Sequence, residues 1–530
     1  MGEGFWSSGV PTNEGIDLMS QVVGRSERPR RVAAKASTED RAVPEDFPRA
    51  AADAGRWRAL AVTQFAAFMI LLDVSIVNVA LPSIERGLAV APQTAQWVVS
   101  GYTLSLGLTL VSAGRLGDSL GRRRMFLVAL TAFVVTSALT GAAPTAGLLI
   151  AARLLQGVAG GMLIPQNSGL IQELFRGAER GRAFGVLGAT IGLATAAGPV
   201  IGGLILSLVS GADAWRWVFY VNVPIGLVAL VLAARLVPAR TGGGGRGTHL
   251  DLIGSLLLGG AILSLLVPVV EADSAGLSRL SWLWGAAALL LTVFGWWEMR
   301  TVARGRQPLL DPRLLRTSGY ASGTAIALVY FVGFTGIWLV LALYFQEGLG
   351  YSPLRSGLTV TPFAIGVAVS AVIAGRLVSR FGRWVTLCGL TATVLGLIAT
   401  ALVLRDATGD PPVWAIVGPL LVAGLGGGMV TSPNMTLTLQ HVPVRMAGAA
   451  GGAVQTAQRI GAAIGTAALT ATFYHALILG GHDYASAVSD ALLTAAGCML
   501  LALLMAFVDA TRGRRGRLRQ AEPNRTTTSN

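Results

Sequence analysis

Long apolar segments recur along almost the whole chain and constrain its fold more than any other feature. Each holds about 20 residues, the length that an α-helix needs to cross a hydrocarbon core about 30 Å thick. Because 53% of the residues are hydrophobic and only 13% are charged, the sequence predicts an all-α polytopic membrane protein. We place fourteen transmembrane helices at 58–81, 96–114, 123–142, 146–169, 183–208, 215–234, 250–269, 280–298, 320–346, 355–377, 384–404, 412–434, 447–475 and 487–508.

The positive charge is concentrated in alternate loops and in both tails, and the intervening loops carry less; the net charge is +14. Lys and Arg mark the cytoplasmic loops of membrane proteins. We therefore expect a multi-pass protein of the cell (cytoplasmic) membrane with both termini cytoplasmic, contacts with membrane lipids, and no nucleic-acid partner. The arginine clusters fall at 25–31, 56–58, 122–124, 176–182, 235–246, 300–316, 376–383 and 512–519.

Nothing in the sequence points to a cofactor. Cys388 and Cys498 both fall inside predicted spans and form no disulfide or metal-binding framework. No GxxxxGK[ST] motif is present, so ATP is not the expected energy source. The first apolar run follows about fifty polar residues, which indicates an uncleaved first helix rather than a signal peptide. We expect a monomer without metal, cofactor or enzyme activity.

An internal repeat predicts two halves. GRLGDSLGRRRMFL begins at Gly114, and a weaker copy, GRLVSRFGRWVTL, begins at Gly375. A six-helix half needs roughly 200 residues, so the interval between the copies leaves room for two further spans. We expect a disordered cytoplasmic tail at 1–57, six-helix bundles at 58–234 and 320–508, a linker with two inserted helices at 235–319, and a basic tail at 509–530.

The first copy of this repeat resembles the signature GxLaDrxGrkxxl of the major facilitator superfamily, which lies between the second and third helices. Glycines permit a tight turn, and a carboxylate can pair with arginines or with the N-terminus of a helix from the other half. The resemblance implies a conformational gate, although the arginines could serve topology alone. The second copy has Ser379 where the first has the carboxylate. The predicted gate residues are Gly114, Asp118, Gly121, Arg122 and Arg123.

A glycine-rich stretch, GVLGATIGLATAAGPVIGG at 185–203, resembles the antiporter motif of exporters in the same superfamily. Glycines allow another backbone to approach closely, and Pro199 removes one hydrogen-bond donor from the helix. The alternative is a motif that only packs helices together. The motif residues are Gly188, Gly192, Gly198, Pro199, Gly202 and Gly203.

Asp73 lies in LDVSIVNVALP, which resembles the first-helix motif of the fourteen-helix drug:proton antiporters of EmrB/QacA type. Counted from Arg58 at 1.5 Å per residue, Asp73 lies roughly 22 Å into the membrane. A carboxylate at that depth is costly unless it is paired, hydrated or protonated. We expect Asp73 to carry the coupling proton; the alternative is a carboxylate that only bonds another helix.

Arg153 is the expected partner of Asp73. It lies in RLLQGVAGG, which resembles the superfamily motif RxxQGxgaA, and the resemblance implies a role in proton transfer. Arg153 lies roughly 10 Å from the outer face and Asp73 roughly 8 Å. The two side chains are therefore predicted to form an ion pair that a substrate or a proton can disrupt.

A set of aromatic and amide side chains is predicted to line a cavity for lipophilic ligands, although each such side chain taken alone more often serves packing than ligand contact. The set comprises Gln156, Gln166, Tyr330, Phe331, Phe334, Trp338 and Gln346. Glu347 is a second-choice proton site. Arg459, roughly 18 Å into its span, argues against multiply charged cations as substrates, unless it snorkels or pairs with a helix end. Asn222 and Pro224 predict a broken sixth helix.

These patterns together indicate a secondary transporter. The resemblance to the EmrB/QacA type implies a drug:H⁺ antiporter that exports lipophilic drugs or antibiotics and is driven by the proton gradient, with small lipophilic molecules and protons as its ligands. A dedicated exporter of one endogenous metabolite, antibiotic or lipid is the first alternative. A non-transporting sensor or scaffold is the second, and it gives no reason to bury Asp73 and Arg153 in the membrane.

Overall fold

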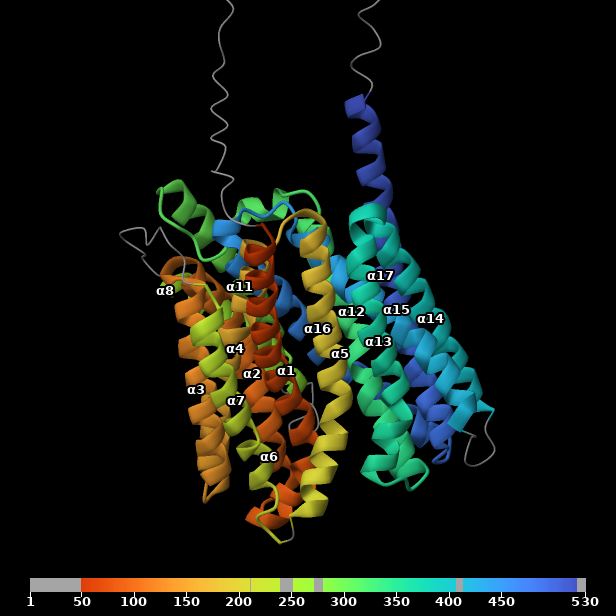
Figure 1. The fold of residues 1–530 in the computed structure, drawn as a ribbon. Coiled ribbons are helices and arrows are strands. Elements are labelled where there is room, and N and C mark those ends of the chain that lie inside the picture. The colour runs from red at the N-terminus through yellow and green to blue at the C-terminus, as the bar shows by residue number, and fades with distance from the viewer. Residues whose placement is uncertain (1–48, 210, 239–250, 271–279, 407–412, 522–530) are drawn as a thin grey trace, which may run out of the picture. The chain divides into compact units, whose positions relative to one another are not determined.

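The computed structural model describes residues 49–209, 211–238, 251–270, 280–406 and 413–521, and every regular element among them is a helix. The helices fall into a first group, an inserted pair and a second group (Figure 1). The first group consists of α1 (Arg49–Leu88), α2 (Pro92–Leu120), α3 (Arg122–Ala142), α4 (Ala146–Leu174), α5 (Gly177–Leu208), α6 (Arg216–Tyr220) and α7 (Asn222–Leu236). The inserted pair consists of α8 (Leu252–Val270) and α11 (Trp282–Ala303), followed by the 3₁₀ helix η1 (Pro312–Arg316).

The second group begins after η1. It consists of α12 (Tyr320–Leu343), the π-helix η2 (Tyr344–Gly348), α13 (Pro353–Phe381), α14 (Arg383–Arg405), α15 (Val413–Leu439), the 3₁₀ helix η3 (Val444–Met446), α16 (Ala447–Leu479) and α17 (Tyr484–Ala521). We call α1–α7 the first bundle and α12–α17 the second bundle.

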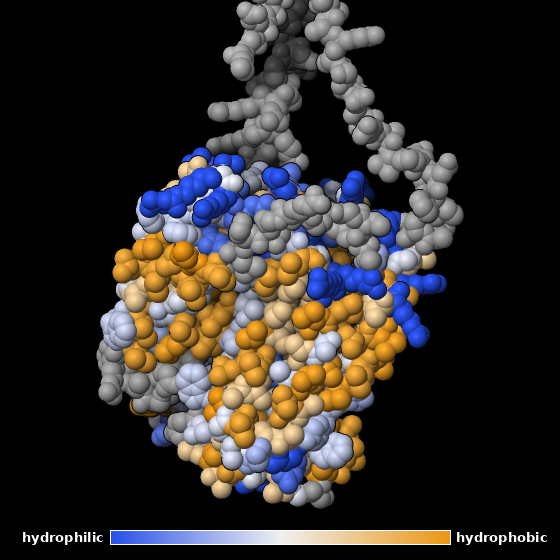
Figure 2. Space-filling view, turned by 90° about the vertical axis from the view of Figure 1, so that its left-hand side faces the viewer, coloured by the Kyte–Doolittle hydropathy of each residue, from blue (hydrophilic) through white to orange (hydrophobic). Residues whose placement is uncertain are grey.

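Twelve membrane-length segments within the described residues are apolar enough to cross a bilayer, six on each side of the inserted pair. The inserted pair occupies the positions of the seventh and eighth predicted spans; the apolar part of α8, Leu252–Pro268, is shorter than the others. The sixth span is divided at Val221 into α6 and α7, as Asn222 and Pro224 predict. Figure 2 shows a broad apolar belt with hydrophilic side chains gathered at both ends.

The repeat in the sequence is also a repeat in the backbone. Gly121 separates α2 from α3 with φ 99°, and Gly382 separates α13 from α14 with φ 55°. These values lie in the left-handed region that glycine adopts without strain. Both copies therefore turn at a glycine with positive φ, although ψ differs, at 126° for Gly121 and −130° for Gly382. We call the end of the molecule where these turns lie the basic end, because Arg122 and Arg383 begin the helices that follow them.

The two bundles have separate apolar cores and a shared one near the basic end. One core contains Ile70, Phe126 and Leu163 of the first bundle only. The shared core brings Phe184 of α5 together with Leu439 of α15 and other residues of both bundles. Burial of apolar surface in this shared core holds the bundles together at the basic end.

Two helix pairs form the seams between the bundles. In the α5–α13 seam, a side chain at Gly181 would collide with the backbone of Gly375. In the α2–α16 seam, Gly114 faces Gly448 and Leu110 faces Gly452 in the same way. Backbones approach this closely only where small residues line the contact.

Candidate functional site

Asp73 of α1 lies at the centre of a buried polar cluster in the first bundle. Its Oδ2 accepts a hydrogen bond from Nη1 of Arg153 at 2.7 Å. Its Oδ1 accepts one from Nδ2 of Asn222 at 2.7 Å and one from Nε2 of Gln156 at 3.2 Å. Both partners of the ion pair are 1% exposed. The structure therefore brings together the two residues that the sequence pairs, and every oxygen of the carboxylate has a donor.

Arg153 of α4 is held by more than its carboxylate partner. Its Nε donates to the carbonyl of Val98 at 3.0 Å, and its Nη1 donates to Oε1 of Gln156 at 2.9 Å. The guanidinium also lies over the ring of Tyr102, 4.1 Å from the centroid, and 5.5 Å from that of Phe219. Aromatic faces stabilise a cation in a site from which water is excluded. Arg153 therefore keeps several contacts when Asp73 is neutralised.

Asn222 is a member of this cluster that the sequence reasoning treated only as a helix breaker. It is the first residue of α7, and its Nδ2 also contacts Oγ of Ser137 at 3.2 Å. Ser137 in turn donates to the carbonyl of Phe219 at 2.9 Å. The sequence signal for this role is an amide side chain at a break in an otherwise apolar span. At such a break, backbone groups that lack a helical partner lie next to a polar side chain.

The predicted gate connects the two bundles at the basic end. Asp118 accepts hydrogen bonds from the backbone N–H groups of Gly448 and Ala449, each at 3.0 Å, at the first turn of α16. It also forms an ion pair with Arg122 at 2.8 Å. The N-terminus of a helix carries positive partial charge, so a carboxylate there is stabilised twice.

Arg122 extends this contact to two further elements. It donates to the carbonyl of Val444, which precedes α16, and it pairs with Glu173 of α4 at 2.9 Å. Arg123 points elsewhere and donates to the carbonyl of Ala234 at the end of α7. Of the predicted gate residues with charged side chains, Asp118 and Arg122 thus contact the second bundle, while Arg123 ties α3 to α7 within the first bundle.

The antiporter motif of α5 faces two different helices. Gly188 and Gly192 lie against α13, where an added Cβ would contact Ala371 or Ala364. Gly198 and Gly202 lie against α1, where a side chain at Gly198 would collide with Ser75. Pro199 lies against Gly357 of α13. Close approach was also expected at Gly203, and there the expectation is wrong, because the space beside it is open.

The predicted cavity residues separate into three groups. Gln156 belongs to the Asp73 cluster, and Gln166 is fully buried with Nε2 bonded to the carbonyls of Ala113 and Met162. Gln346 and Glu347 are exposed on the π-helix η2. The third group, Tyr330, Phe331, Phe334 and Trp338, forms an aromatic cluster of the second bundle. Phe363, which was not predicted, joins it, and the ring centroids lie 5.0–6.4 Å apart.

Arg459 of α16 is half-buried, and within the described part of the chain it makes no hydrogen bond or ion pair. Its guanidinium therefore differs from that of Arg153, whose charge is balanced by a carboxylate.

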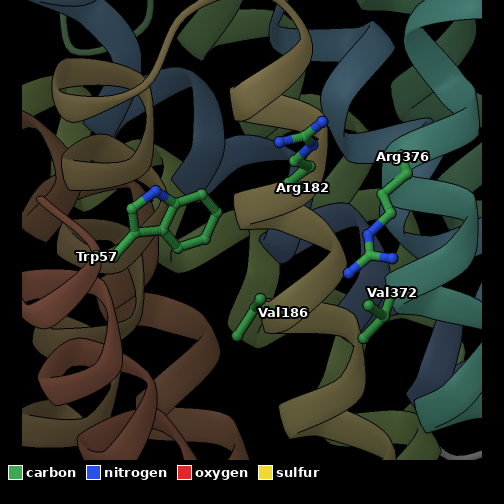
Figure 3. A pocket seen from close by; sticks show the side chains of 5 residues that line it. All are labelled: Trp57, Arg182, Val186, Val372 and Arg376. Atoms are coloured by element: carbon green, nitrogen blue, oxygen red, sulfur yellow. The ribbon is translucent and has the colours of Figure 1, made fainter. Parts of the chain in front are cut away.

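A pocket of about 370 Å³ opens at the basic end beside the α5–α13 seam. Figure 3 shows Arg182 of α5 and Arg376 of α13 with their guanidinium groups toward the space between these helices, and Trp57 of α1 on the other side. Val186 and Val372 complete the lining. The pocket combines two cations with aromatic and apolar surface.

Comparison with known families assigns this architecture. The family model described as Major Facilitator Superfamily matches residues 64–466 of the chain, which include the Asp73 cluster, the gate and the antiporter motif. The chain belongs to the major facilitator superfamily. Members of this superfamily are membrane transporters, and the chain is accordingly a multi-pass membrane protein.

Similar curated proteins come from Streptomyces and Mycobacterium species. The chain is 37% identical over 435 residues to the probable actinorhodin transporter of Streptomyces coelicolor, covering 82% of this chain and 75% of that protein. It is 36% identical over 472 residues to puromycin resistance protein pur8 of Streptomyces alboniger, covering 86% and 92%. It is 34% identical over 417 residues to multidrug resistance protein Stp of Mycobacterium tuberculosis, covering 77% and 74%.

Solved structures share the fold at low sequence identity. The proton:xylose symporter XylE superposes with a TM-score of 0.62 at 14% identity, covering 86% of this chain and 96% of the other. The human transporter MFSD10 superposes with a TM-score of 0.59 at 15% identity, covering 85% and 99%. These likenesses concern the arrangement of the helices alone.

Proposed function

We propose that this protein exports lipophilic drugs or antibiotics across the cytoplasmic membrane in exchange for protons. The observation that carries the proposal is the buried Asp73–Arg153 ion pair, with both carboxylate oxygens occupied by donors. The names of the similar proteins, which include transporters and resistance proteins for actinorhodin, puromycin and several drugs, support an export function.

In this proposal, Asp73 is the group that exchanges its proton. A proton on Asp73 removes the charge that Arg153 balances, and Arg153 then stays with Val98, Gln156 and Tyr102. Protonation from outside would accompany release of the substrate, and deprotonation toward the cytoplasm would reset the ion pair. The basic end is then cytoplasmic, in accord with its arginines, and transport needs no ATP, metal or cofactor.

The breadth of the substrate range defines the second candidate function. A dedicated exporter of one compound is favoured by relatives named for single antibiotics, such as the actinorhodin and tetracenomycin C proteins. A multidrug exporter is favoured by the relative named as a multidrug resistance protein. Both candidate functions use the exchange of a proton on Asp73, and they differ only in how many compounds trigger proton movement.

The test uses inside-out vesicles that contain the full-length protein and carry an imposed pH gradient. Lipophilic compounds of different charge are added, and the gradient is followed with a fluorescent pH probe. We expect at least one compound to dissipate the gradient with wild type and with the control Asp490→Asn, whose carboxylate is half-exposed, but not with Asp73→Asn. Equal proton movement in wild type and Asp73→Asn would overturn proton coupling through Asp73.

A further inference from the structure

We infer that Arg459 binds the negatively charged group of the exported compound, so that the substrates of this transporter are amphipathic aromatic acids rather than lipophilic cations. The inference rests on the proposed export function and names the substrate class that the site would take.

The register of the α2–α16 seam places Arg459 beside Tyr102. The helices run antiparallel, with Gly114 opposite Gly448 and Leu110 opposite Gly452. Continuing this register along both helices brings Arg459 opposite position 103 of α2, next to Tyr102. The packing of Ile460, the next residue, against the apolar cluster that contains Leu104 of α2 agrees with that placement. Arg459 therefore lies where the two bundles face each other, not on the lipid-facing side.

The preceding turn of α16 shows that the face carrying Arg459 points toward the first bundle. Gln455, four residues earlier, donates from Nε2 to Oγ of Ser168 on α4 at 2.7 Å. Residues four apart lie on the same face of a helix. Arg459 therefore points toward the first bundle as well, one turn further from the basic end than the Gln455–Ser168 contact.

Neighbouring carboxylates are already occupied. Asp73 is bonded to Arg153, Asn222 and Gln156, and Asp118 is bonded to Arg122 and to the first turn of α16. The side chain of Arg459 is too short to reach water at the basic end, because the residue lies roughly 18 Å from the start of its helix. A cation inside the membrane without a counter-charge is costly. The missing counter-charge is most simply supplied by the transported molecule.

Tyr102 links this part of the seam to the Asp73 cluster. Its side chain lies in the core of the first bundle, with the hydroxyl against Gly160 of α4, and the guanidinium of Arg153 covers one face of its ring. The guanidinium of Arg459 is itself complementary to a carboxylate, phenolate or sulfonate, because it presents several donors in a planar fork. An anion bound to Arg459 would therefore be separated from the Arg153–Asp73 pair by the ring of Tyr102.

The aromatic cluster of the second bundle packs against the same turn of α16 from the other side. Phe331 of α12 lies against Gly461, and its ring contacts continue into Phe334 and Trp338. Residues two apart point to nearly opposite sides of a helix, so the cluster contacts the face of α16 that is turned away from Arg459. At the basic end, the pocket with Arg182 and Arg376 has the same sign of charge.

The test measures binding to the purified full-length protein by calorimetry with three probes on one anthracene ring: a sulfonate, its neutral sulfonamide and a trimethylammonium derivative. We expect wild type to prefer the sulfonate. Arg459→Gln should weaken sulfonate binding by about tenfold or more and sulfonamide binding by less than about twofold, because a charge-assisted contact is lost. Arg459→Lys should retain part of the affinity. The exposed Arg58→Gln is the matched control.

The outcomes separate this inference from the proposed function. Unchanged sulfonate affinity in Arg459→Gln would overturn the inference, and so would a preference of wild type for the ammonium probe. Neither result would exclude export, because cations could still drive proton movement in the vesicle assay. Sulfonate binding that depends on Arg459, without proton movement, would support the site and overturn antiport. Because Arg459→Gln removes an uncompensated cation, the melting temperature of this variant should equal or exceed that of wild type. A clearly lower melting temperature would show that Arg459 has a partner within the protein and would refute the inference.

Discussion

The carboxylate of Asp118, at the end of α2, accepts a hydrogen bond from the backbone N–H of Gly448, at the start of α16, across the boundary between the bundles. Ala449 donates to the second oxygen, and Arg122 balances the charge. One side chain thus joins the bundles at the basic end. Opening of that end would require this contact to break, so we expect the Asp118 contact to favour the state that is closed there.

The Asp118 contact leads to a prediction for Asp118→Asn. The substitution replaces one acceptor oxygen by a donor and removes the charge, so the closed state should lose about 1.5–3 kcal/mol, or roughly 10- to 100-fold in population. Spin labels at positions 120 and 445, in a background without Cys388 and Cys498, should report a larger population at long distance.

Ser379→Ala is the matched control for the gate. Ser379 occupies the corresponding place in the second copy of the repeat, and its hydroxyl donates only to the carbonyl of Arg376 in its own helix. The distance distribution should stay as in wild type. An unchanged distribution in Asp118→Asn as well would mean that the gate is held by the apolar contacts alone.

The Asp73–Arg153 pair leads to a prediction for a double-mutant cycle. Removing one partner of a buried ion pair leaves an uncompensated charge and typically costs about 3–5 kcal/mol. Asp73→Asn and Arg153→Gln should each lower the unfolding free energy in detergent, and the double variant should lose much less than the sum. Additive losses would argue against a direct interaction.

The control cycle uses Arg405 and Asp490. Their charged groups lie 4.0 Å apart and both side chains are about half-exposed. Exposed pairs contribute about 0–1 kcal/mol, so the cycle on this pair should give little coupling. The difference between the two cycles isolates what burial adds to the Asp73–Arg153 interaction.

The antiporter motif leads to a prediction for two glycines five residues apart on α5. Gly198→Ala should reduce transport strongly, because the new methyl group would collide with Ser75 of α1. Gly203→Ala should leave transport unchanged and raise helix stability by about 0.5–1 kcal/mol, since the space beside Gly203 is open. Rates measured in the same vesicles, normalised to the amount of inserted protein, decide the comparison. Equal effects of both changes would contradict the assignment of contacts.

Asn222 leads to a prediction about support of the carboxylate. Asn222→Ala removes the 2.7 Å hydrogen bond to Oδ1 of Asp73 and leaves a small cavity, so stability should fall by about 1–3 kcal/mol. Proton movement driven by substrate should also decrease. Gln440→Ala changes an amide at an exposed position and serves as the control. Wild-type proton movement in Asn222→Ala would assign Asn222 a structural role only.

The large-scale organisation could be predicted from sequence because it follows from composition and repetition. Apolar segments long enough to span a membrane, and a turn motif present twice, predict two groups of helices. The depth of each residue in the membrane also predicted the contact between Asp73 and Arg153, because an unpaired buried charge is costly and opposite charges at the same depth can pair. Both rules depend on distances along the chain alone.

Features that depend on rotation about a helix axis could not be predicted in the same way. Gly198 and Gly203 look alike in sequence, yet one faces α1 and the other open space. Gln166 was expected in a cavity wall, and the structure bonds its amide nitrogen to the carbonyls of Ala113 and Met162. The role of Asn222 was missed because an asparagine at a helix break usually satisfies the local backbone.

The inserted pair makes the two flanks of the transporter unequal. Leu104 of α2, Ile262 and Leu266 of α8, and Ile460 of α16 pack together, so α8 lies over the α2–α16 seam. Lipophilic molecules dissolve in the bilayer and can approach a transporter sideways through the lipid. On this flank they would meet α8 and α11 before the seam. Uptake from the leaflet would therefore favour the opposite flank, where α5 and α13 border the pocket with the two arginines.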